Sequence, residues 1–175
     1  PLDKIGVVTL DQHFDLRDTS QGLLNGNPIS ALLDDGMPGR NIAQVGIAAY
    51  ANSAHYHQVA KENGINVITM DRVHEKGIDA CLNGVFHSLP QNLEAVYFDL
   101  DVDVLDRSFA PACPGARPGG LTPAQVRRAA YWMGTKPQVV GMDLVEIDPE
   151  NDIHDTTCLS AGTFLLSFAA GLLQR

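Results

Sequence analysis

The chain contains the stretch Ile5-Gly6-Val7-Val8-Thr9-Leu10-Asp11-Gln12-His13-Phe14-Asp15, in which an apolar run passes directly into alternating polar residues. The run Ile5–Leu10 is typical of a buried β-strand. Asp11, His13 and Asp15 occupy alternate positions, so at strand-like spacing their side chains point the same way. Unpaired charge is costly to bury, and a bound cation would turn that cost into a benefit. A solvated loop that caps a following helix is the other interpretation of this stretch taken alone.

Length and composition indicate one ordinary globular domain over residues 1–175. Of the 175 residues, 45% are hydrophobic and 19% are charged, and the formal net charge is −9. This charge argues against nucleic acid or an anionic membrane as the main partner, and no apolar run approaches the ~20 residues of a membrane span. The three cysteines lack metal-like spacing, which favours a reducing, cytoplasmic location. Because the chain starts at Pro1 and enters a strand pattern almost at once, we expect it to lack the N-terminal part of a larger protein.

Strand-like runs alternate with helical patterns along the whole chain. The expected strands are Ile5–Leu10, Ile42–Ile47, Asn66–Met70, Ala95–Phe98 and Gln138–Val145. The expected helices are Pro28–Leu33, Ala51–Asn63, Gly77–Leu89, Thr122–Met133 and Thr156–Leu173. The strand runs are rich in Val and Ile rather than alternating, as in parallel strands that are covered on both faces. This order predicts an α/β domain with right-handed crossovers and a mainly parallel sheet.

Carboxylates follow three of the five expected strands. In parallel sheets, ligands bind beyond the carboxyl ends of the strands. The acids found there are Asp11 and Asp15, Asp101 and Asp103, and Glu146. Four carboxylates of the first two pairs could not all stay ionised close together without cations, and a single divalent ion would leave excess negative charge. A carboxylate-rich set with one imidazole suits Mn²⁺ or Mg²⁺ better than Zn²⁺, so we expect two such ions, held where the first and fourth strands lie side by side.

These motifs resemble those of the ureohydrolase family of arginase, agmatinase and formimidoylglutamase. The matching segments are Asp11–Asp15, Asp101–Asp106, Phe109–Leu121 and Val145–Pro149. The resemblance implies a three-layer α/β/α fold, with about five strands of the sheet present in this chain. It also implies a site for two Mn²⁺ ions that hydrolyses a C–N bond in a small linear amidine or guanidine. Homo-oligomers are a further implication of the resemblance.

The resemblance assigns metal-binding roles position by position. Asp11 and Asp101 would bridge the two ions, and His13 and Asp103 would complete one of them. Asp15 would bind the other ion and orient the bridging hydroxide that attacks the substrate carbon. Asp15 is therefore also a predicted catalytic residue.

The resemblance assigns the substrate side of the site as well. Glu146 matches the acid that faces the amidinium or guanidinium group, and it is a predicted catalytic and substrate-binding residue. Asn25 stands where arginases and agmatinases have a histidine, and Arg17 could bind a substrate carboxylate. The plainer interpretations are an Asn-Gly turn for Asn25 and an ion pair with Asp18 or another acid for Arg17. The asparagine, with the residues flanking Asp15, favours formimidoylglutamase activity, which converts N-formimidoyl-L-glutamate to L-glutamate and formamide.

Three neighbouring residues are expected to support the site rather than react. Asp99 shares the face of Asp101 in an extended chain, and we expect it to form hydrogen bonds behind the ligands. Asp143 is expected to act similarly. Cys113 has no identifiable histidine partner that would activate it, so we expect it to be inert.

Other functions remain open at this point. Agmatinase or another guanidino hydrolase would release urea instead of formamide. A non-catalytic relative would hold a single ion, because the family has one more metal-binding histidine before the motif at Asp11 and no histidine precedes Asp11 here. Gln12 is a further departure, since the family usually has alanine at that position. A deacetylase on the related fold would need neighbouring histidines near a strand end, and this chain shows no such pair.

Overall fold

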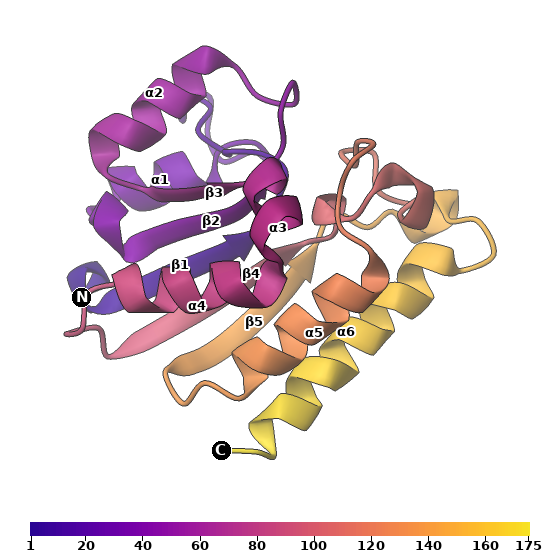
Figure 1. Cartoon of the computed structure of the whole chain (residues 1–175). Helices are drawn as coiled ribbons and strands as arrows, with labels where there is room; N and C mark the ends of the chain where they lie inside the picture. Colours follow the sequence, from indigo (N-terminus) through magenta and orange to yellow (C-terminus); the bar gives the residue numbers. More distant parts are fainter.

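Parallel strands form one sheet in the order β3-β2-β1-β4-β5 (Figure 1). The computed structural model describes all 175 residues, and its strands are β1 (Ile5–Leu10), β2 (Ile42–Ile47), β3 (Asn66–Thr69), β4 (Ala95–Asp101) and β5 (Val139–Val145). The chain starts in the middle of the sheet, grows outward through β2 and β3, and then returns to the other side of β1. The prediction that the first and fourth strands lie side by side is therefore confirmed.

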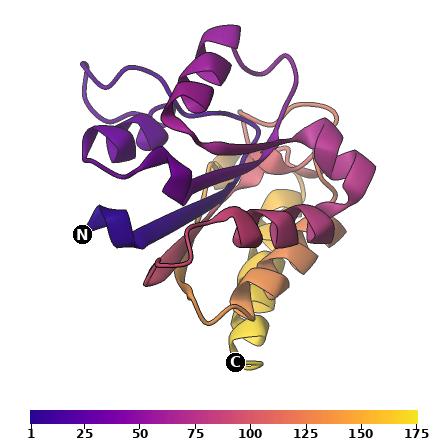
Figure 2. The same cartoon turned by 60° about the vertical axis from the view of Figure 1, so that its left-hand side comes forward.

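Helices cover both faces of the sheet, which confirms the predicted three-layer architecture (Figures 1 and 2). They are α1 (Pro28–Asp34), α2 (Ala54–Asn63), α3 (Met70–Lys76), α4 (Ile78–Ser88), α5 (Pro123–Gly134) and α6 (Thr156–Leu172). Short 3-10 turns span Leu2–Lys4, Gly39–Asn41, Val102–Val104, Arg107–Phe109 and Pro149–Asn151. None of the helices combines the length and the hydropathy needed to cross a bilayer.

The central strand β1 contributes to two separate hydrophobic clusters. Val8 and Leu10 belong to the larger cluster, which β1 shares with α3, α4, α5 and α6. Val7 points to the other face and packs in the smaller cluster with residues of α1 and α2, such as Ile29 and Ala60. Successive side chains of a strand alternate between faces, so a strand covered on both sides must be apolar at nearly every position.

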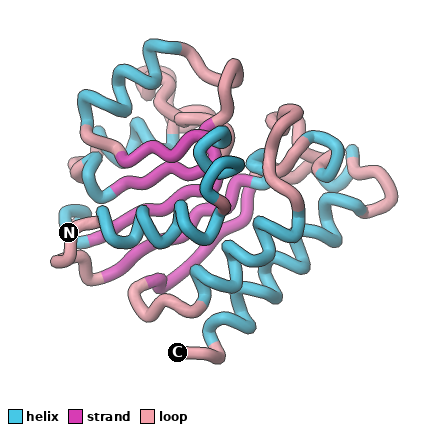
Figure 3. Tube along the Cα trace, in the orientation of Figure 1, coloured by secondary structure: helices cyan, strands magenta, loops and turns pink.

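The longest connections lie beyond the carboxyl ends of the strands, as the pink segments of Figure 3 show. They follow β1, β4 and β5 and occupy residues 11–27, 102–122 and 146–155. A capping box at Thr122 closes the second of these connections, with the Thr122 and Gln125 side chains each accepting a backbone N–H of the other residue. The acidic motifs therefore all lie at the carboxyl ends of the strands.

The ends of β3 and β4 differ from the prediction, and α2 begins at Ala54 instead of Ala51. Met70 was expected to end the third strand, but it begins α3, because the Thr69 hydroxyl accepts a hydrogen bond from the N–H of Arg72 and so caps a helix there. The fourth strand was expected to end at Phe98 and continues to Asp101. Asp99 therefore lies inside the sheet, in register with Thr9 of β1 and Asp143 of β5.

The close packing of α5 against α6 predicts how a glycine-to-alanine substitution in either helix changes the stability of the fold. A Cβ added at Gly134 would overlap the carbonyl oxygen of Phe168, whereas a Cβ at Gly162 of α6 would meet open space. We expect Gly134→Ala to lower the free energy of unfolding by about 1–3 kcal/mol, because the two backbones must separate. Gly162→Ala should leave it unchanged or raise it by up to about 1 kcal/mol. Urea denaturation measures both, and equal effects would contradict the close approach of the helices.

Candidate metal centre

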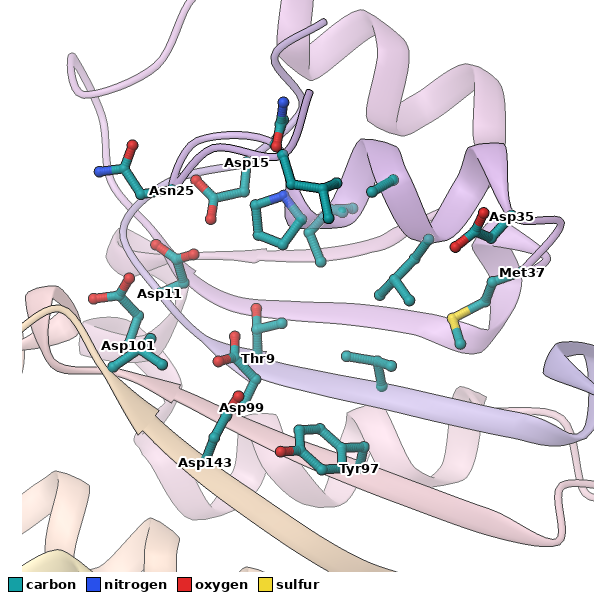
Figure 4. Close-up of a pocket in the computed structure, with 18 of the residues that line it drawn as sticks. Thr9, Asp11, Asp15, Asn25, Asp35, Met37, Tyr97, Asp99, Asp101 and Asp143 are labelled. Atoms are coloured by element: carbon teal, nitrogen blue, oxygen red, sulfur yellow. The ribbon is translucent and has the colours of Figure 1, made fainter. Parts of the chain in front are cut away.

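The ends of β1 and β4 place two aspartates side by side. Leu10 pairs with Leu100, so Asp11 and Asp101 are the next residues on neighbouring parallel strands. Both are buried, with exposed fractions of 2% and 6%. In Figure 4 their carboxylates lie near each other and near Asp15 at one end of a pocket. The residues predicted to bridge two ions are thus brought together by the sheet.

His13 and Asp103 join this pair from the two loops. The Nδ1 atom of His13 lies 2.6 Å from Oδ2 of Asp103 and 3.7 Å from Oδ1 of Asp11. One possible ligand atom from each of these three residues lies within 4.8 Å of the others. The three side chains therefore form a cluster with the size and donor atoms of a metal site.

Both aspartate motifs turn sharply instead of continuing as strands. The Oδ1 atom of Asp11 accepts a hydrogen bond from the N–H of His13 at 2.5 Å. In the same way, Oδ1 of Asp101 accepts one from the N–H of Asp103 at 2.7 Å, and Asp103 lies in a 3-10 turn. The expectation of simple strand-like alternation was wrong for these segments. The side chains converge because each loop folds back onto the last aspartate of its strand.

Burial and mutual repulsion make the carboxylates of the cluster hard to ionise. Burial raises the pKa of Asp11 and of Asp101 well above the usual range, and the neighbouring acids raise both further. Burial also raises the pKa of Asp15 to about 7. The hydrogen bond to Asp103 raises the pKa of His13, the only basic side chain that pairs with Asp11 or Asp103. Buried oxygen donors with so little compensating charge fit a divalent cation such as Mn²⁺ or Mg²⁺.

Asp15 and Glu146 lie on the wall of the pocket beside the cluster. The pocket has a volume of about 680 Å³, and Asp11, Asp101 and Asn25 also line it. The φ angles of Asp15 and Glu146 are 52° and 64°, a left-handed conformation that few non-glycine residues adopt. Such backbone strain persists only where surrounding contacts hold it, and it is common at functional sites.

Arg17 belongs neither to the cluster of possible metal ligands nor to the residues that line the pocket. Its side chain is exposed and lies against Gly26. It forms no ion pair within 4.0 Å, so the expected alternative of a salt bridge with Asp18 is wrong. The turn containing Asn25 is held by the buried Asn27 side chain, which donates to the carbonyls of Asp18 and Gly22.

Comparison with known proteins agrees with this geometry. Residues 2–171 match the sequence model of the arginase family. The chain belongs to the arginase family. The predicted family and fold are thus confirmed.

Relatives in the arginase family include formimidoylglutamases. The chain is 34% identical to formimidoylglutamase of Halalkalibacterium halodurans over 169 residues, which are 95% of this chain and 53% of that protein. The crystal structure of formimidoylglutamase from Bacillus subtilis has a TM-score of 0.93 and 34% identity, and the match covers 97% of this chain and 54% of that one. The structure of Trypanosoma cruzi formiminoglutamase with Mn²⁺ has a TM-score of 0.91 at 25% identity, covering all of this chain and 58% of that one. The chain therefore spans little more than half the length of these relatives.

A row of polar residues across the sheet continues the acidic cluster of this arginase-family chain. Thr9, Asp99 and Asp143 lie in register and line the pocket, and Figure 4 shows them together. Burial and the charge of Asp143 raise the pKa of Asp99 to about 8. The expected role of Asp99 in hydrogen bonding stays a prediction. Only the strand register shows that Thr9 and Asp143 are its partners.

Cys113 lies close to the acids but is unsuited to act as a nucleophile. It is fully buried, and burial with the nearby Asp101 and Asp103 raises the pKa of its thiol to about 12. A thiol with that pKa is almost entirely protonated at neutral pH. The structure therefore supports the expectation that Cys113 is inert.

The raised pKa values predict how stability depends on pH without metal. The pKa of Asp15 is about 7 in the folded chain and about 4 when unfolded. Between these values the folded state binds more protons, so the free energy of unfolding falls as pH rises. The raised pKa of His13 acts in the same direction, because the stability of its protonated form is lost as pH rises through the folded-state pKa.

In EDTA, we expect the melting temperature to fall between about pH 5 and about pH 8. Added Mn²⁺ should raise it more at the higher pH, because the ion binds ionised carboxylates. Differential scanning fluorimetry measures both effects. A melting temperature in EDTA that stays level or rises over this range would contradict the buried acid cluster.

Proposed function

We propose that this chain carries the two-manganese site of a hydrolase that acts on a linear amidine, most closely that of a formimidoylglutamase. The observation that carries the proposal is the convergence of Asp11, His13 and Asp103 within 4.8 Å, with Asp101 on the adjacent strand. The 34% identity with formimidoylglutamases supports the substrate class. The relative whose structure was solved with Mn²⁺ supports the metal.

In this proposal each acid of the cluster has a separate task. Asp11 and Asp101 would hold both ions, His13 and Asp103 would complete one of them, and Asp15 would hold the other. When bound, the ions offset the negative charge and make water a good nucleophile at neutral pH. Without metal the pKa of Asp15 is about 7, so binding of an ion at neutral pH would displace a proton from this carboxyl group in part of the molecules.

The charges around the pocket give the substrate an orientation. Glu146 lines the pocket and can pair with the amidinium group through a charge-assisted hydrogen bond. Asn25 lies at the same wall and can donate or accept a hydrogen bond. Arg17 is exposed and has no acidic partner, so its guanidinium is free to bind the carboxylates of a glutamate derivative. The cationic end of the substrate thus enters the pocket and the anionic end stays near Arg17.

A guanidino substrate is the second candidate, and the composition of the pocket favours it. The lining residues include seven acids, Asp11, Asp15, Asp35, Asp99, Asp101, Asp143 and Glu146, and no Lys, Arg or His. Such a pocket concentrates cations and repels carboxylates. A substrate with a guanidinium group and no carboxylate, such as agmatine, would satisfy this field.

Location and assembly belong to the same proposal. Cys81, Cys113 and Cys158 are all free, which suits a protein of the reducing cytoplasm. Assembly into homo-oligomers, expected from the family resemblance, stays a prediction.

The products of hydrolysis distinguish the two substrates. The purified chain is incubated with Mn²⁺ and either N-formimidoyl-L-glutamate or agmatine, and formamide and urea are assayed. We expect formamide from the first substrate. Urea from agmatine would support the second candidate instead. Calorimetric titration that finds one weak Mn²⁺ site, together with no hydrolysis of either compound, would favour the non-catalytic relative and overturn the proposal.

Removing a single charge from the cluster should weaken metal binding and leave the fold intact. We expect Asp101→Asn to weaken Mn²⁺ binding by about tenfold or more and to remove hydrolysis, because a neutral amide is a poor ligand. Without metal the variant should be at least as stable as the wild type, since one of the repelling acids is gone. Asp3→Asn, at an exposed acid near the other end of β1, is the control and should bind Mn²⁺ normally. Equal affinities of the two variants would contradict the assignment of Asp101.

A further inference from the structure

The loop that follows β1 is held by side-chain amides. Backbone groups that leave a sheet must find other hydrogen-bond partners when they are buried. The Gln12 side chain donates to the carbonyl of Leu105 at 3.1 Å, and the Gln44 side chain donates to the carbonyl of Phe14 at 3.0 Å. Asn52, from the loop between β2 and α2, contacts the backbone of both Gln12 and Phe14. These amides fix the loop against three other segments of the chain.

Asn52 occupies a special place among them because it bonds on both sides of His13. Its Nδ2 atom donates to the carbonyl of Gln12 at 2.8 Å and to that of Ala48 at 3.2 Å. Its Oδ1 atom accepts the N–H of Phe14 at 3.0 Å. The two peptide groups that flank His13 are therefore tied to one side chain. Their orientation decides where the imidazole points.

The chemistry of this contact requires an amide. Asparagine offers two N–H donors and a carbonyl acceptor, and here it meets two carbonyls and one N–H. Aspartate would set a carboxylate against two carbonyl oxygens, and alanine would leave all three backbone groups without this partner. Ser53, the next residue, caps α2 by accepting the N–H of Tyr56, so the helix anchors Asn52 in place.

We propose that Asn52 is a positioning residue, which orients His13 toward Asp103 and Asp11 and thereby sets the affinity of the site for its metal. The inference rests on the proposed function, since it assumes that the cluster binds Mn²⁺. Asn52 lies about forty residues after the motif and is outside the pocket that the acids line. Its effect on the metal therefore passes through the backbone of the loop.

Asn41 provides a matched control at the opposite end of β1. Its Nδ2 atom donates to the carbonyls of Asp3 at 3.1 Å and Ile5 at 3.0 Å, and the residue is 1% exposed. Asn41→Ala thus also removes an amide that holds backbone beside β1, but far from the acids. A loss of general stability should appear in both variants, whereas a loss of metal affinity should appear in Asn52→Ala alone.

The test combines two measurements on the wild-type chain and both variants. Calorimetry with Mn²⁺ should show an affinity about tenfold or more lower in Asn52→Ala, and an unchanged affinity in Asn41→Ala. Hydrogen exchange without metal should be faster for residues 11–15 in Asn52→Ala and unchanged there in Asn41→Ala. If Asn52→Ala does not fold, Asn52→Ser is used, and the same changes are expected at smaller size because the hydroxyl keeps one hydrogen bond.

The outcomes separate this inference from the proposed function. Wild-type affinity in the Asn52 variant, or an equal loss in Asn41→Ala, would overturn the positioning role. If the wild-type chain binds no Mn²⁺, the proposed function fails. In that case the exchange of residues 11–15 still decides whether Asn52 holds the loop, and unchanged exchange overturns the inference independently.

Discussion

The parallel pairing of β1 with β4 is the contact on which the candidate site depends. It joins segments about ninety residues apart and aligns Leu10 with Leu100, so that Asp11 and Asp101 become neighbours. A shift of one residue in this register would turn the two carboxylates to opposite faces of the sheet. Burial on both faces of β1 prevents such a shift, because Val7 and Val8 belong to different hydrophobic clusters. The core of the domain therefore determines which acids meet.

Bringing these acids together raises the pKa values of their carboxyl groups. Burial raises the pKa of Asp11 and of Asp101, so without metal the cluster retains protons that exposed carboxyl groups would lose. A bound divalent ion would replace those protons, and this exchange would link metal binding to pH. Metal binding and the stability of the fold thus depend on the same carboxyl groups. The hydrogen bonds from Gln44 and Asn52 to the loop preserve the arrangement while the charges repel each other.

The similarity to known relatives and the charges of the pocket give information about different ends of the proposed substrate. In the proposed function, the similarity to formimidoylglutamases favours an amidine joined to glutamate. The pocket contains only acids among its charged residues, and Arg17 is the exposed cation that is proposed to bind the carboxylates. Both observations agree if the amidinium is buried and the carboxylates remain at the rim. Asp15 and Glu146, both with a left-handed backbone, line the wall of this pocket.

The sequence by itself determined the α/β class, four of the five strands to within one residue at each end, and the residues of the acidic motifs. These features depend on local periodicity, on turn chemistry and on motifs that are short. The sequence did not predict the third helix, because Thr69 caps a helix that has no strong apolar periodicity. It also did not predict the full length of β4, because Asp99 lies in the sheet through its pairing with Thr9 and Asp143. Only the tertiary structure decided which acids converge, how each loop folds back, and that Asn52 holds the motif. Those relations are hydrogen bonds and register between distant segments, and a linear pattern of residue types does not contain them.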